Sequence, residues 1–206
     1  MQYPTNILDA PIATELLAFF DENPVNKMLS FVGFDLLTFD GITDEAASVV
    51  AESGLDPLYL DSLKLLSPEA ARRLARFKGG FLSLCGLEEM SPEVAAAIAE
   101  YRGSVLSLNG LVDLTPEVAA ELSRFPGLLT LNGIMAISVA TADALVPHRG
   151  DLVLDGLLHL PDDVAEALSK HEGKSLSLES LRFMSDAAVQ ALAGYRGKLE
   201  MMTDGE

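Results

Sequence analysis

Two of the three histidines and the single cysteine are the first side chains to consider for a metal site or a nucleophile. His148 and His171 stand 23 residues apart, and two imidazoles could share a metal ion if the fold brought them together. No third ligand is apparent, and no histidine near Cys85 in the sequence could activate its thiol. We therefore expect no metal, no cofactor and no catalytic residue.

Two further patterns resemble ligand sites but are incomplete. Gly173, Lys174 and Ser175 match the end of a phosphate-binding loop, but the glycine required five residues earlier is replaced by Leu168. The carboxylates of Asp35, Asp40 and Asp61 could come together around calcium, but they lack the spacing of a known calcium loop. The sequence thus predicts a protein that is not an enzyme.

The charge balance excludes one class of partner and suggests another. The 206 residues carry 14 Lys and Arg against 31 Asp and Glu, a net charge of −17, which argues against nucleic-acid binding. Residues 1–61 hold eleven of the acids and one base, Lys27. This excess either serves solubility or steers a basic protein partner. The single cysteine and the lack of a signal-like or membrane-spanning apolar run favour a cytoplasmic protein that does not enter a membrane.

A Leu-x-Leu pair recurs every 23 or 24 residues. This period indicates a repeat architecture, which would position all these side chains. The alternation of buried and exposed residues predicts a short strand with one buried side. A shorter copy precedes the series at Leu37 and Phe39, and a truncated copy follows it at Leu199 and Met201. The full pairs are Leu58/Leu60, Leu82/Leu84, Leu106/Leu108, Leu129/Leu131, Leu152/Leu154 and Leu176/Leu178.

Each strand is followed by the signals of a helix. Ser67, Ser91 and Thr115 each precede Pro-Glu, an order that suits a helix N-cap, first position and positive end. Each helix ends at a glycine, which favours the turn back into the next strand. Stacked copies would bury one continuous core, with strands along the concave face and helices along the convex face. In such a stack His148 and His171 would stand where other copies have Phe or Tyr. Membership of an aromatic stack is thus the alternative to a pair of metal ligands.

This pattern resembles the leucine-rich repeat superfamily, in a short bacterial variety with Ala-rich helices such as "PEVAAAIAE". The resemblance covers roughly residues 37–202 and implies an α/β solenoid whose concave face binds other proteins. The chain departs from the commonest subclass, which has Asn three residues after the second leucine, so functions of that subclass are not carried over. The apolar residues at that place are Leu63, Leu87, Leu111, Ile134, Leu157 and Leu181.

The expected organisation has three parts. Residues 1–36 are predicted to form an N-terminal helical cap, with Thr14 as its N-cap and Leu16, Leu17, Phe19 and Phe20 closing the first repeat. Residues 37–198 would hold one short and six full repeats, and residues 199–206 a terminal strand and tail. The incomplete last repeat is either itself the cap or an edge that pairs with a second copy.

The outward positions of the strands are the candidate binding residues. Tyr59 and Phe81 are the large anchors, and both lie towards the acidic N-terminal end. The Asp or Asn after each pair is often followed by Gly, so this row either closes turns by bonding the local backbone or faces a ligand. The candidate partner-binding residues are Tyr59, Asp61, Phe81, Ser83, Ser107, Asn109, Thr130 and Asn132.

The sequence therefore favours a non-catalytic module that binds a protein partner through its concave face, with the chain a monomer or a weak homodimer. One alternative is a structural protein that self-assembles through its C-terminal coil. Another is a non-catalytic subunit of an enzyme complex.

Overall fold

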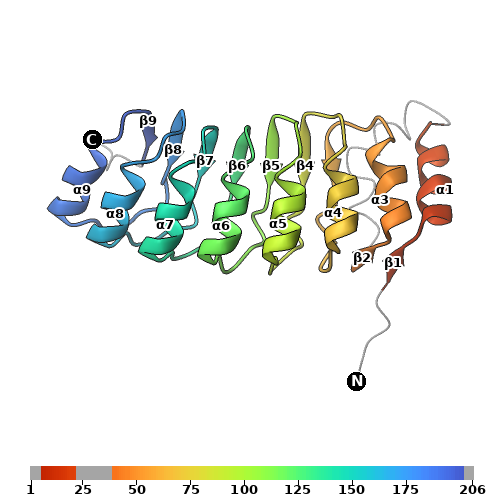
Figure 1. The fold of residues 1–206 in the computed structure, drawn as a ribbon, viewed down its shortest axis with the longest axis horizontal. Helices are drawn as coiled ribbons and strands as arrows, with labels where there is room; N and C mark the ends of the chain where they lie inside the picture. Colours follow the sequence, from red (N-terminus) through yellow and green to blue (C-terminus); the bar gives the residue numbers. More distant parts are fainter. Residues whose placement is uncertain (1–5, 22–38, 202–206) are drawn as a thin grey trace, which may run out of the picture.

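Strands and helices alternate along a computed structural model that describes residues 6–21 and 39–201. Figure 1 shows the helices side by side in one row, with the strands aligned in a second row beside them and the first and last helices at opposite ends. Seven strands form one parallel sheet in chain order, so every coil contacts the coil before and after it. They are β3 (Leu58–Tyr59), β4 (Phe81–Ser83), β5 (Val105–Ser107), β6 (Leu128–Thr130), β7 (Asp151–Val153), β8 (Ser175–Ser177) and β9 (Lys198–Glu200).

The helices begin where the capping signals predict. Ser67 Oγ accepts a hydrogen bond from Ala70 N at 2.9 Å, and Ser91 and Thr115 cap their helices in the same way. Helix α8 is the exception, because Pro161 stands at its N-cap and offers no side-chain acceptor. The helices of the stack are α3 (Asp44–Ala51), α4 (Pro68–Leu74), α5 (Pro92–Ile98), α6 (Pro116–Leu122), α7 (Val139–Leu145), α8 (Asp162–Leu168) and α9 (Asp186–Leu192).

The recurring leucines form one spine inside the stack. Leu82, Leu106 and Leu129 lie in register on neighbouring strands and are completely buried, as are the second leucines of the same coils. The buried residues join into a single cluster from Leu8 to Tyr195. The prediction of an α/β repeat solenoid is therefore confirmed.

The coils approach closely where each helix turns back into a strand. The Tyr101 hydroxyl donates to the carbonyl of Gly79 in the preceding coil at 2.8 Å. A Cβ added to Gly150 would lie 1.8 Å from the carbonyl oxygen of Gly127, a distance that two non-bonded atoms cannot adopt. Glycine is needed here because the backbones of successive coils touch.

The N-terminal segment differs from the prediction in two ways. Helix α1 (Ala10–Asp21) begins earlier than expected, with Asp9 Oδ1 accepting from Ile12 N at 3.0 Å. Thr14 is therefore inside the helix, where its hydroxyl donates to Ala10 O at 2.8 Å, and its predicted N-cap role is wrong. A strand β1 (Ile7–Leu8) also precedes this helix and pairs in parallel with β2 (Gly41–Ile42).

The predicted closing residues of α1 divide between core and solvent. Leu16 and Leu17 pack against the core, whereas Phe19 is 49% exposed and does not close it. Of the short repeat copy, Phe39 is buried and Leu37 lies outside the described residues. At the other end, β9 pairs with β8, and Leu199 and Met201 are partly buried. No helix in the described part of the chain is long and apolar enough to span a membrane.

Candidate functional site

The strand face is the surface formed by the outward side chains of β3 to β9 and the residues that follow them. Near its N-terminal end the rings of Tyr59 and Phe81 contact each other, with centroids 5.2 Å apart and planes at 49°. Both side chains are only partly buried, because they flank leucines that point into the core. The two predicted anchors are therefore brought together from neighbouring strands.

The serines of this face are less accessible than the sequence suggests. Ser83 is 2% exposed and Ser107 is 5% exposed, although both stand between paired leucines at outward positions of their strands. Ser83 Oγ donates to Asp61 Oδ1 at 2.5 Å, and Ser107 Oγ accepts from Thr130 Oγ1 at 3.1 Å. Neighbouring parallel strands lie about 4.8 Å apart, so these short side chains are covered by the longer ones beside them. Thr130 remains partly exposed.

The row of Asp and Asn bonds to the next coil and not to its own turn. Asp61 Oδ1 accepts from Cys85 N at 2.8 Å, and Asn109 Oδ1 accepts from Asn132 N at 2.9 Å. Asn132 and Asp155 repeat the pattern further along, each accepting from the backbone one coil later. The predicted local bond is wrong because stacked copies place each side chain one strand spacing from the next backbone N–H. The row therefore ties the coils together.

Cys85 occupies the place of an Asp or Asn in this row. Its thiol is partly exposed and lies 3.2 Å from Ser83 Oγ and 3.1 Å from Ser107 Oγ. A hydroxyl cannot take the thiol proton at neutral pH, so these contacts do not activate a nucleophile. They are hydrogen bonds within the polar network of the strand face.

His148 and His171 stack on each other with centroids 5.8 Å apart, and His171 stacks in turn on Tyr195. Both are buried, and His148 Nε2 donates to the carbonyl of Asp151 at 3.2 Å. Burial lowers the pKa of both imidazoles, that of His171 to about 4. The interpretation as members of an aromatic stack is confirmed, and Phe77, Tyr101 and Phe125 form the same stack in earlier coils.

The described aspartates among the possible calcium ligands, Asp40 and Asp61, bond to different parts of the backbone. Asp40 Oδ2 accepts from Asn6 N at 3.2 Å, Asp61 belongs to the row that joins the coils, and Asp35 lies outside the described residues. His159 is exposed on a loop and pairs through its backbone with Phe183. Among residues 6–21 and 39–201, no three His, Cys, Asp or Glu side chains are grouped as metal ligands.

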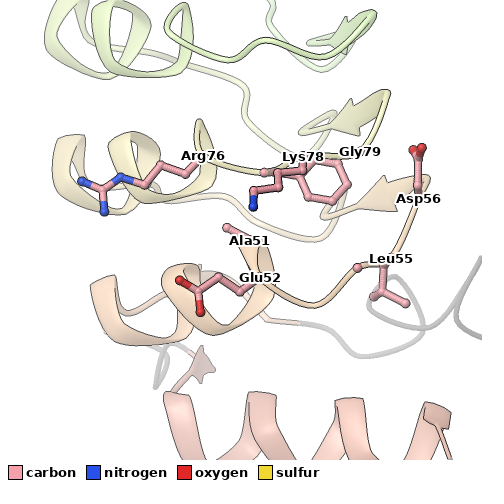
Figure 2. Close-up of a pocket in the computed structure, with 9 residues that line it drawn as sticks. Ala51, Glu52, Leu55, Asp56, Arg76, Lys78 and Gly79 are labelled. Atoms are coloured by element: carbon pink, nitrogen blue, oxygen red, sulfur yellow. The ribbon is translucent and has the colours of Figure 1, made fainter.

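An open pocket that the sequence did not reveal lies where two coils turn back into their strands. It is lined by residues after α3 and α4, including Glu52, Asp56, Lys78 and Gly79. Figure 2 shows Lys78 extending towards the preceding coil, while the carboxylate of Asp56 points away from it. Asp56 Oδ1 accepts from Phe81 N at 3.2 Å, so its role is to hold a strand.

Comparison with known proteins leaves the structure as the main guide to function. No protein-family model matches the chain, and no curated protein is significantly similar to it.

Proposed function

We propose that this chain is a cytoplasmic leucine-rich repeat protein that binds another protein through its strand face and has no catalytic activity. The support for the family is the leucine register, the capped helices and the parallel sheet, all of which follow the 23- or 24-residue repeat. The support for binding is the pair of aromatic side chains on the strand face.

The contact between Tyr59 and Phe81 carries the proposal. Aromatic side chains are enriched among the residues that dominate binding energy, because they bury a large area with little loss of conformational entropy. Val105 and Leu128 follow Phe81 at the same place on the next two strands, and both are partly exposed. Together these four side chains make a partly apolar strip, and Asp61 lies beside its N-terminal end. Such a strip suits a partner with apolar and basic groups.

Substituting both anchors tests this location. The Tyr59→Ser/Phe81→Ser variant should lose its partner when tagged chain is used to isolate binding proteins from native cells. The matched control, Val153→Ser/Glu179→Ser, alters the C-terminal half of the same face and should retain the partner. If the two variants isolate the same proteins as the parent chain, the anchors are not the binding site.

Self-association through the last coil is a second candidate. Leu199 and Met201 are partly buried at β9, and Lys198 and Glu200 form an ion pair on this same strand. Two copies of β9 paired in antiparallel fashion about Leu199 would place each Lys198 opposite the other copy's Glu200. Sedimentation over a range of protein concentrations distinguishes a dimer from a monomer. A Leu199→Lys substitution should abolish any dimer that forms in this way.

A further inference from the structure

A row of exposed apolar side chains runs along the edge at which each strand leads into its helix. This loop edge lies on the side of β1 and β2, the lower edge in Figure 1. The apolar row consists of Val112, Met135, Leu158 and Phe183, which are 59%, 64%, 42% and 78% exposed. It holds four of the nine large hydrophobic side chains that are exposed in the described part of the chain.

The row spans four successive coils and is offset by one residue in the last of them, where Arg182 takes the place of Leu158 and Phe183 follows it. Val112, Met135 and Leu158 each follow a buried residue at the same place in the repeat, so they stack one coil apart. The next coil joins them through its backbone, since Arg182 N donates to Leu158 O at 3.2 Å and Phe183 pairs with His159. A contiguous exposed apolar surface of this kind is typical of an interaction site.

The surroundings of the apolar row are acidic. The loops and first helical turns of these four coils, residues 110–117, 133–140, 156–163 and 180–187, hold five Asp or Glu and a single Lys or Arg, Arg182. Asp113 follows Val112 directly, and Asp162 and Asp163 begin the helix after Leu158; all three acids are exposed. The positive helix N-termini favour acids at these positions, and the exposed carboxylates place negative charge beside the row.

We propose that the loop edge binds a polypeptide segment in which apolar side chains alternate with Lys or Arg. The apolar side chains would cover the row from Val112 to Phe183, and the cations would face Asp113, Asp162 and Asp163. This surface is separate from the strand face and does not depend on the function proposed for it.

A second copy of the chain fits this edge less well. The opposite edge, where helices turn back into strands, is basic: residues 76–80, 100–104, 124–128, 147–151, 170–174 and 194–198 hold nine Lys or Arg and three Asp or Glu. Its charge would complement the loop edge. However, these six ranges contain none of the large hydrophobic side chains that are exposed in the described residues, so they offer little to cover the apolar row.

Binding of a labelled amphipathic peptide of about 14 Leu and Lys residues, followed by fluorescence anisotropy, tests the proposal. The Met135→Ser/Phe183→Ser variant should raise the Kd by about tenfold or more, as expected when apolar anchors are lost. The Asp162→Asn/Asp163→Asn variant should raise the Kd several-fold and weaken its dependence on salt. Circular dichroism should show that both variants stay folded, because all four side chains are exposed.

Matched controls separate this site from general attraction to an acidic protein. Ile12→Ser/Val189→Ser removes two exposed apolar side chains elsewhere, and Glu52→Gln/Glu100→Gln removes two charges elsewhere. Both controls, and Tyr59→Ser/Phe81→Ser, should change the Kd by less than about twofold. Equal losses in controls and loop-edge variants would overturn the proposal, as would equal binding of a Leu and Glu peptide. So would self-association of the parent chain that Met135→Ser/Phe183→Ser abolishes.

Discussion

Asp and Asn side chains on the strand face hold the backbone of the following coil. Asn109 is the clearest case, because its Oδ1 accepts from Asn132 N at 2.9 Å while its Nδ2 donates to Ser107 Oγ at 3.1 Å. One residue thereby satisfies a backbone donor and a nearly buried hydroxyl. An amide at this place serves both the stability of the coil stack and the polarity of the surface.

Removing this amide should destabilise the chain measurably. We expect Asn109→Ala to lower the free energy of unfolding by about 1–2 kcal/mol, because Asn132 N–H loses its acceptor. Asn109→Asp keeps the acceptor and should cost less. Urea denaturation followed by circular dichroism measures both. Equal stability of the parent chain and Asn109→Ala would show that the bond between coils contributes nothing.

The stacked histidines should make stability depend on pH. Because burial lowers the pKa of His171 from 6.5 to about 4, the unfolded chain binds the proton first, and stability falls as the pH drops between these values. The pKa of the neighbouring His148 is shifted in the same direction, chiefly by its own burial. Charging His171 alone should cost at most about 3 kcal/mol. Asp151 and Glu172 lie near the pair and oppose part of the shift.

A His171→Phe variant isolates this effect, since Phe77 and Phe125 occupy the same stack in other coils. Thermal unfolding of the variant should depend less on pH between 6.5 and 4 than that of the parent chain. An unchanged pH dependence would assign the acid sensitivity to other groups.

The N-caps of α4 and α9, Ser67 and Ser185, link their helices to the helix of the coil before. Ser67 both caps α4, through Ala70 N, and donates to Asp44 Oδ1 in the first turn of α3 at 2.8 Å. The Ser67 side chain therefore links α3 to α4 as well as capping α4. Helix α8 starts without such a residue, and Asp163 Oδ1 instead accepts from Val164 N at 2.9 Å.

Losing the Ser67 cap should cost about 1 kcal/mol of unfolding free energy in Ser67→Ala, while Ser67→Thr should retain most of it. Equilibrium denaturation of the two variants measures the difference. Equal losses would mean that the hydroxyl does not act as the cap.

Close contact between coils gives a second prediction for the helix-to-strand turns. Gly150→Ala would drive a Cβ against the carbonyl of Gly127 and should destabilise the chain by more than about 2 kcal/mol. At Gly80 the nearest atoms to an added Cβ are 3.6 Å away or further, so Gly80→Ala serves as the control. Comparable unfolding midpoints for the two variants would contradict the tight approach of the coils.

Across the whole molecule the charges are divided between two edges. Acids gather where helices begin and bases where they end, as the helix dipole favours, so a chain of net charge −17 still presents a basic edge. Interactions between exposed charges are screened over about 10 Å at moderate salt, so a partner would respond to the edge it meets more than to the net charge.

The repeat predicted the spine, the strands and most helix starts, because Leu84, Leu108 and their equivalents can be buried only when copies stack. It could not predict which backbone Asn109 would bond, since Asn-Gly is equally a signal for a local turn. Thr14 matched a cap, but Asp9 offered a competing one. Val112, Met135 and Leu158 are apolar at a place where other repeats have a charged residue, which the sequence shows. Their exposure depends on the path of the loops, which the sequence does not show.

Photo-crosslinking in native cells tests the central claim, protein binding by the strand face, most directly. A benzophenone amino acid would replace Tyr59 on this face, Val153 further along it, or Ala140 on the exposed side of α7. We predict a defined covalent adduct with one partner protein from position 59, weaker or no adduct from 153 and none from 140. Adducts that form equally from all three positions, or none from position 59, would contradict binding at the Tyr59–Phe81 pair.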